Sequence, residues 1–447
     1  MGRHRGNWVL PGAVALGVAL IATACSSSSS TSTTTTTAPS SSTTAASTPT
    51  ASSPGVTATA INVGAISTRT GAIASDFDGL SPGIQAYFDL INSQGGINGR
   101  KLLLSYNLDD GGQPSQFTQL THTLIDQDHA FAVMVASYWF TPNYFVETNT
   151  PTYGYNVSGN WAGPPNLFAA GGSVQNYSAG VPAYAYVLNQ THSKSVAIIS
   201  YGPSITSSYD ACNTTATELA KAGFTVSYED FGAQLGGSYT SAVQRMQEAG
   251  SQFVISCMQE SDNITMARAI QQYGLKIHQL WLSGYDQSLL NQYSGLMQGV
   301  YFNVSGNVPY QAVGGRFGNT YTGMIQYLAT MNKYEPAFTY NGVAQQGWQS
   351  AVLLADAIKL AGNDLTQANI IKVTNNITNF TAGGLTTVTS WKVSHSGTTY
   401  PTCSAYVVVH GTRFVPVFGK GKQVFVCVGP DASDTTPVPA PAGTPGT

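Results

Sequence analysis

The feature that most constrains the fold is an alternation of short apolar strands with amphipathic helices, which occurs twice along the chain. The first run has strands at 60–66, 100–106 and 130–136, separated by helical patterns at 80–91 and 114–128. The second run has strands at 195–200, 225–228, 253–256 and 279–282, with helices at 210–222, 239–249 and 264–273. Strands that alternate with helices form parallel sheets with helices on their faces. Two such runs predict an α/β protein with two doubly wound lobes.

The C-terminal third of the chain follows a different pattern. Helical spacing continues at 317–330, 341–360 and 366–373. The stretch 386–428 is rich in Val, Thr, Tyr and Phe with polar alternation, which predicts a β-meander. The tail 429–447 consists largely of Pro, Ala and Thr, and we expect it to be disordered.

The N-terminus has the pattern of a secretory signal. A basic start at Arg3 and Arg5 precedes an apolar run at 8–22, which is too short to span a membrane. Small residues then lead to Cys25, in a setting that resembles a bacterial lipobox. We expect residues 1–25 to be a lipoprotein signal peptide and Cys25 to carry the lipid that anchors the protein outside the cytoplasm. Ordinary cleavage nearby, which would free a secreted protein, is the alternative.

The segment after Cys25 is almost entirely Ser, Thr, Ala and Pro as far as residue 54. Such a composition cannot bury a core, and we expect residues 26–54 to be a disordered linker between membrane and body. Charged residues make up only 9% of the chain and the net charge is −3, so no basic face is available for nucleic acid.

Four cysteines remain in the body: Cys212, Cys257, Cys403 and Cys427. In an extracytoplasmic protein they most simply form two disulfides, for which three pairings exist. We favour Cys403 with Cys427, because both lie on strand-like segments of the C-terminal meander, which leaves Cys212 for Cys257. Buried free thiols are the alternative.

The stretch GGINGRKLLLSYNLDDGGQPSQ at 95–116 is similar to the region after the first helix in periplasmic binding proteins of the Leu/Ile/Val-binding type. The segments KAGFTV and YGLKIHQLWLSGYD extend the resemblance through 195–289. This resemblance implies a type I fold with three hinge crossovers, near 169–171, 300–303 and 383–386. The first lobe would comprise 58–169 and 301–382, and the second 170–300 and 383–428. It also implies a monomer that closes on an amino acid or a relative and docks to an ABC permease.

Loops at the carboxyl ends of the strands are where an α/β sheet binds ligands. The candidates in these loops, together with an aromatic residue beyond the first crossover, are Ser137, Tyr138, Trp139, Tyr155, Asn156, Tyr177, Gln259, Glu260, Tyr285 and Asp286. The resemblance implies that Ser137 holds a ligand α-carboxylate and that Tyr177 covers the ligand. Glu260 or Asp286 would pair with an ammonium, and the aromatic rings suit a cation.

No catalytic motif stands out. The chain lacks a P-loop, GxGxxG and HExxH, and its histidines are scattered. We therefore expect no enzyme activity, no cofactor and no metal site. The adjacent acids Asp109 and Asp110 are expected to cap the next helix or line the cleft rim. Two other functions stay open: a sensor module that signals through a protein partner, and a secreted α/β hydrolase.

Overall fold

The computed structural model describes residues 53–447, so the expected signal peptide and Cys25 lie outside the described residues. The first sheet has the strand order β2-β1-β3-β4-β5, and all its pairs are parallel. Its strands are β1 (Ala60–Ser67), β2 (Lys101–Asp109), β3 (Ala132–Ala136), β4 (Thr152–Gly154) and β5 (Leu167–Ala169). Every residue of β3 is buried, as expected for a central strand covered on both faces.

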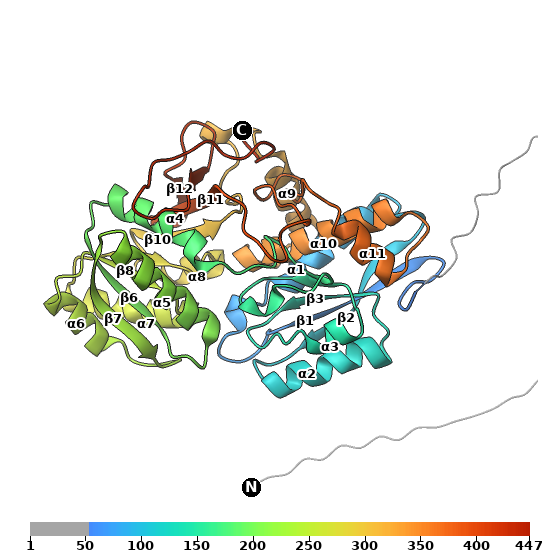
Figure 1. Cartoon of the computed structure of the whole chain (residues 1–447), viewed down its shortest axis with the longest axis horizontal. Helices are drawn as coiled ribbons and strands as arrows, with labels where there is room; N and C mark the ends of the chain where they lie inside the picture. The colour runs from blue at the N-terminus through green and yellow to red at the C-terminus, as the bar shows by residue number, and fades with distance from the viewer. Residues whose placement is uncertain (1–52) are drawn as a thin grey trace, which may run out of the picture. The chain divides into compact units, whose positions relative to one another are not determined.

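Helices cover both faces of the first sheet (Figure 1). On one side lie α2 (Pro114–His122), continued by a π-helical turn (Thr123–Gln127), and α3 (Asn143–Glu147). On the other lie α1 (Leu80–Ser93), α10 (Gly342–Ala361) and α11 (Gln367–Thr374). Helices α1 and α10 approach closely because Gly83 and Gly347 have no side chain. A Cβ on Gly83 would stand 1.9 Å from the carbonyl oxygen of Ala344.

The second sheet has the order β12-β11-β10-β9-β8-β6-β7, and β13 pairs with β11. Its strands are β6 (Ser195–Tyr201), β7 (Thr225–Ala233), β8 (Phe253–Ser256), β9 (His278–Trp281), β10 (Val300–Ser305), β11 (Thr402–His410), β12 (Arg413–Val417) and β13 (Phe425–Val428). Its helices are α4 (Tyr177–Gln190), α5 (Thr206–Lys221), α6 (Thr240–Glu248), α7 (Glu260–Tyr273) and α8 (Gln287–Tyr293). The doubly wound α/β prediction is confirmed.

The C-terminal third differs from the sequence-based expectation in three places. The helix expected at 317–330 is α9 (Thr322–Tyr334), because Gly314, Gly315 and Gly318 take positive φ angles around a short 3-10 turn (Gly315–Phe317). The expected meander begins only at Thr402, and 386–401 contain no strand. Strand β10 spans the region of the second predicted crossover and pairs with β9 and β11, so the chain stays in the second sheet as far as Ser305.

The tail 429–447 has no regular secondary structure, but it packs against the body. The amide of Val438 donates to the carbonyl of Cys427 at 2.8 Å, and Asn189 donates to Thr435 at 3.0 Å. Thr444 is buried with 2% of its surface exposed. The prediction of a disordered tail from composition alone therefore differs from the structure, because the tail finds partners that only the folded body provides.

Two disulfides join Cys212 to Cys257 and Cys403 to Cys427, which is the pairing that the sequence favours. The second bond links β11 to β13, where the two cysteines are directly paired across the strands. Among residues 53–447, no helix is long and apolar enough to cross a membrane.

Candidate ligand-binding site

The loop after β1 reaches the second sheet through Asp76. This residue ends a 3-10 turn (Ala74–Asp76) and is 7% exposed. Its Oδ1 accepts a hydrogen bond of 2.6 Å from Ser283, which follows β9. Its Oδ2 is buried and has no hydrogen-bond partner among residues 53–447. The contact joins loops at the carboxyl ends of strands in two different sheets, which is where α/β proteins place ligands.

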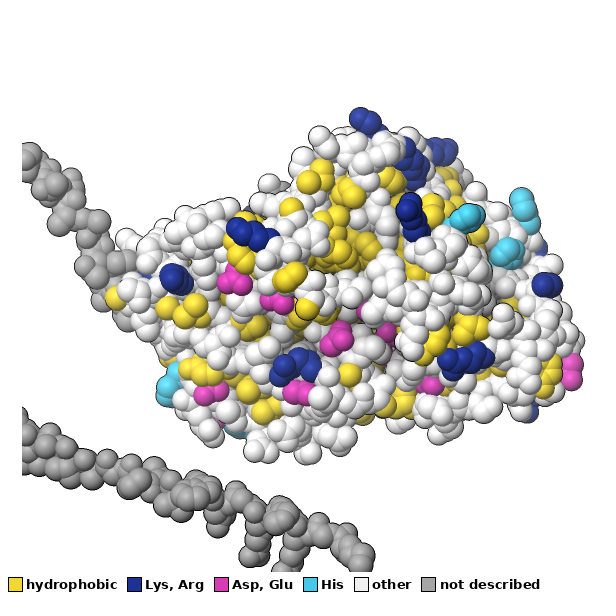
Figure 2. All heavy atoms as spheres, turned by 180° about the vertical axis from the view of Figure 1, so that it is seen from behind, with side chains coloured by type: hydrophobic (Ala, Val, Ile, Leu, Met, Phe, Trp, Pro, Cys, Tyr) yellow, Lys and Arg dark blue, Asp and Glu magenta, His cyan; other side chains and the backbone are white. Residues whose placement is uncertain are grey.

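Asp76 interacts electrostatically with Asp78 and Glu260, and both of these interact with Asp286. The four are called here the acidic cluster. Glu260 is the first residue of α7 and is 5% exposed. The side-chain amide of Asn341 donates to Oδ1 of Asp78 at 3.2 Å, next to the point where Asn341 and Asp286 form a backbone bridge. Figure 2 shows acidic side chains at separate places across one face of the molecule, some of them near its middle.

Burial and mutual repulsion hold the pKa values of Asp76, Asp78 and Glu260 above their usual range. Burial raises the pKa of Asp76 to about 7, with smaller contributions from the charges of Asp262 and Asp78, against the hydrogen bonds from Ser283 and from the backbone of Glu260. Burial and the charge of Asp286 raise the pKa of Asp78 to about 6. The pKa of Glu260 lies well above its ordinary value, first through burial and then through Asp76 and Asp286.

No basic side chain forms an ion pair with the acidic cluster in the described part of the chain. The three ion pairs found there are His122–Asp126, Lys221–Glu218 and Lys359–Asp356, all on exposed helix surfaces. Buried carboxylates without a cation are costly when they ionise. The cluster therefore favours either protonation or a positively charged partner.

Aromatic rings lie beside the acids on the first-sheet side. The ring of Tyr138 meets Phe77 edge-on at 4.6 Å, and Tyr155 lies 6.3 Å from the same ring. Burial, followed by the charges of Asp76 and Glu260, raises the pKa of Tyr155 to about 12. Tyr177, the first residue of α4, is half-buried, and burial raises its pKa to about 12 as well. These rings and acids combine apolar surface with negative charge.

The hydroxyl of Ser137, which we predicted to hold a ligand carboxylate, has hydrogen-bond partners within the protein. It donates to Oδ2 of Asp110 at 2.5 Å, and its oxygen accepts from the amide of Trp139 at 3.0 Å. Thr68 donates to the other oxygen of Asp110 at 2.7 Å. The serine proton is therefore used inside the first lobe.

The remaining predicted residues fall into different surroundings. Asn156 donates to the carbonyls of Gly172 and Ser173, and its Oδ1 is buried without a partner among the described residues. Trp139 packs against the apolar cluster that contains Phe117 and Phe140. The amide nitrogen of Gln259 donates to Ser261 and Asp262, while its Oε1 has no partner within 53–447.

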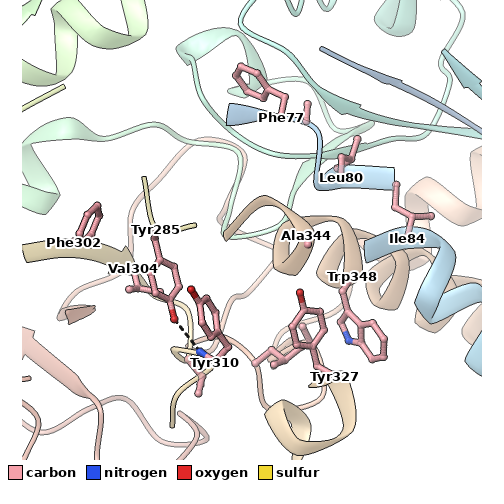
Figure 3. Close-up of a cluster of buried hydrophobic side chains, with 14 of the residues drawn as sticks. Phe77, Leu80, Ile84, Tyr285, Phe302, Val304, Tyr310, Tyr327, Ala344 and Trp348 are labelled. Atoms are coloured by element: carbon pink, nitrogen blue, oxygen red, sulfur yellow. Dashed lines mark hydrogen bonds between the residues drawn. The ribbon is translucent and has the colours of Figure 1, made fainter. Parts of the chain in front are cut away.

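Tyr285 and Asp286 have structural partners of their own. Tyr285 stacks on Tyr310 at 4.5 Å inside the apolar core, as Figure 3 shows, and its hydroxyl donates to Gln311 and accepts from the Tyr310 amide. Asp286 caps α8 by accepting from the amides of Ser288 and Leu289. The structure brings Glu260, Tyr138 and Tyr155 together, with Asp286 at their edge.

Asp76 and Asp78 were not among the residues predicted from the sequence to bind the ligand. A signal was present, because two acids stand close together in the loop after the first strand of a chain in which charge is scarce. Among residues 53–447, no group of three His, Cys, Asp or Glu side chains is placed to hold a metal ion.

Comparison with known proteins adds a family match. A sequence model of the periplasmic binding protein family matches residues 60–408. Leu/Ile/Val-binding protein homolog 3 of Brucella melitensis is 25% identical over 305 residues, which are 64% of this chain and 76% of the relative.

Two solved structures with low sequence identity share the fold. A fatty acid ABC transporter substrate-binding protein from Thermomonospora curvata has a TM-score of 0.67 at 16% identity, covering 88% of this chain and 98% of its own. A leucine-binding protein from Thermotoga maritima has a TM-score of 0.65 at 14% identity, and the match covers 80% of this chain and 97% of the Thermotoga chain.

Proposed function

Because the chain belongs to the periplasmic binding protein family and has its type I fold, we propose that it is an extracytoplasmic solute-binding protein of an ABC importer. Its ligand is an amino acid or a related amine, held between the two lobes. The family consists of solute-binding proteins, and small ligands bind in concave sites where lobes meet. The observation that supports this most is the acidic cluster, buried between loops of two sheets without a basic partner in 53–447.

The chemistry of the cleft supports an amine. An ammonium group supplies the positive charge and the hydrogen-bond donors that buried carboxylates require. The rings of Tyr138 and Tyr155 add apolar surface and faces suited to a cation. The names of the similar proteins do not select a ligand, since one is named for fatty acids and another for leucine.

Thermal unfolding of the full chain tests this function. A panel of amino acids, amino acid amides, diamines, fatty acids and sugars would be added one at a time at neutral pH. A ligand that binds only the folded state adds about 2.7 kcal/mol of stability at a hundredfold excess over its dissociation constant. We expect a rise in Tm with at least one amine. The rise should be lost in Glu260→Gln and kept in Glu248→Gln, which removes an exposed carboxylate at the end of α6.

A panel in which only fatty acids or sugars raise Tm would contradict an amine ligand. The lipid anchor has a separate test, because it rests on Cys25. The full chain should be found with the membrane fraction, and Cys25→Ser should release it. A Cys25→Ser variant that stays on the membrane would contradict lipid anchoring at this residue.

A further inference from the structure

Two segments that connect the first sheet to the second are hydrogen-bonded to each other, and they are called here the paired connections. The earlier one, 170–176, leads from β5 to α4, and the later one, 375–401, leads from α11 to β11. The carbonyl of Ser394 in the later segment accepts from the amides of Ser173 and Val174 in the earlier one, at 2.9 and 3.1 Å. The two connections are therefore fastened together where they pass between the sheets.

His395 lies next to this contact, and its ring is buried against two aromatic side chains. Only 9% of its surface is exposed. The centre of its ring lies 5.2 Å from that of Phe168 in β5 and 5.6 Å from that of Trp391. The His395 carbonyl also accepts from the amide of Gly163, in the loop before β5, at 2.7 Å. The residue therefore joins the later connection to the first lobe.

Both ring nitrogens of His395 are buried, and neither has a hydrogen-bond partner among residues 53–447. Buried polar atoms normally have partners, so this ring is held by its apolar contacts alone. Such a ring is sensitive to any change in its charge, because nothing in the pocket is bonded to its nitrogens.

The chain around the ring is almost free of charge. No Asp, Glu, Lys, Arg or His occurs in 148–191, which contains β5 and the earlier connection. The basic residues closest in sequence to the later connection, Lys372 and Lys392, are exposed. The titratable group behind Phe168 is the phenol of Tyr153, which is hydrogen-bonded to Thr374 at 3.1 Å. The surroundings therefore offer no anion to a protonated ring.

A neutral imidazole suits this pocket better than an imidazolium does. The cost of burying an unpaired charge exceeds what a cation–π contact with the neighbouring rings returns. Burial accordingly lowers the pKa of His395 below its usual value. Above about pH 6.5, where an exposed histidine is neutral, the buried ring stabilises the contact, and this stabilisation is lost as the pH falls below that value.

We propose that His395 is a pH-sensitive switch in the paired connections. The neutral ring holds the later connection in place, and protonation moves the ring into water. The carbonyls of Ser394 and His395 then lose their fixed position, and with it their bonds to the amides of Ser173, Val174 and Gly163. Acid therefore loosens the link between the two sheets. This inference goes beyond the proposed function and involves no ligand, so either one can fail while the other stands.

Proton NMR of the full chain, without added ligand, tests the protonation step. The imidazole signal that disappears in His395→Phe or in His395→Gln belongs to His395, and its chemical shift is followed from pH 8 to pH 4. We expect a midpoint at least about one pH unit below the usual value of about 6.5, which is a tenfold weaker affinity for the proton. A midpoint at or above that value would overturn the proposal, because the pocket would then stabilise the cation.

Hydrogen exchange at the amides of Ser173 and Val174 tests the loosening. Rates at pH 7.5 and pH 5 are corrected for the intrinsic effect of pH on exchange. At pH 5 an exposed histidine is protonated about thirtyfold more often than it is neutral, so protection of these amides should fall by about thirtyfold. Amides of β3 should stay protected at both pH values, which shows that the protein remains folded.

Two variants separate the switch from a ring that merely fills space. His395→Phe keeps an aromatic ring that cannot take up a proton, so protection of Ser173 and Val174 should be the same at both pH values. His410→Phe, at an exposed position at the end of β11, should respond as the wild type does. Protection that is equal at both pH values in the wild type, or that falls as much in His395→Phe, would refute the switch. The wild-type result alone decides this if His395→Phe does not fold.

Discussion

Replacing Asp76 with asparagine should stabilise the folded protein at pH 8 but not at pH 4. Burial is the main reason that the pKa of Asp76 rises from 3.8 to about 7. A carboxyl group whose folded pKa exceeds its unfolded pKa binds more protons when folded. The free energy of unfolding therefore falls as pH rises from about 4 to about 7, and Asp76 opposes folding above that range.

The size of the effect follows from the shift. A rise from 3.8 to about 7 corresponds to about 4 kcal/mol of lost stability once the group is ionised in both states. Asparagine removes this loss and keeps an oxygen that can accept from Ser283. Its new amide nitrogen replaces an oxygen that has no partner within 53–447, and an unpaired buried donor costs about 1–3 kcal/mol. We expect a net gain of about 1–3 kcal/mol at pH 8.

Urea unfolding at pH 4 and pH 8 measures this gain, with the free energy obtained by linear extrapolation. The matched control is Asp364→Asn, at an exposed aspartate that accepts a hydrogen bond from Thr366. The gain should appear only for Asp76→Asn and only at the higher pH. An equal change in unfolding free energy at both pH values, or destabilisation at pH 8, would refute the reasoning.

Three further changes test the fold. Gly83→Ala should destabilise the protein by about 3 kcal/mol in urea unfolding, because the new Cβ would meet a carbonyl oxygen of α10 at 1.9 Å. The control Gly295→Ala should not destabilise it, because no atom lies within 4 Å of a Cβ at that position. Replacing both Cys403 and Cys427 with serine opens a loop of 24 residues and should cost about 3 kcal/mol; an unchanged midpoint would contradict the bond. Tyr285→Phe should cost about 1–2 kcal/mol in urea unfolding without reducing the rise in Tm that a bound ligand produces, and loss of that rise would place this hydroxyl in the ligand site instead.

Much of the fold could be predicted because helices and strands have local apolar periods. The helix predicted at 341–360 is α10 (Gly342–Ala361), and the strand predicted at 130–136 contains β3 (Ala132–Ala136). Where the local sequence pattern predicted a different structure from the one observed, tertiary contacts account for the difference. The tail 429–447 looked disordered by composition, yet it hydrogen-bonds to Asn189 and Cys427.

The candidate site could be located in part. Parallel strands place their following loops at one edge, which directed attention to Ser137 and Glu260. The sequence could not show that the hydroxyl of Ser137 is taken by Asp110, 27 residues earlier. Nor could it show that Asp76 reaches Ser283, 207 residues away.

The sequence by itself determined the order and type of the elements, since the repeat of apolar side chains within a segment decides which face is buried. It also determined that charge is scarce, so each acid in a loop stands out. Only the tertiary structure decided which acids face one another and which hydroxyls remain free. Burial and repulsion depend on neighbours that lie far away in the chain, and the pKa of Asp76 is raised by groups from both lobes.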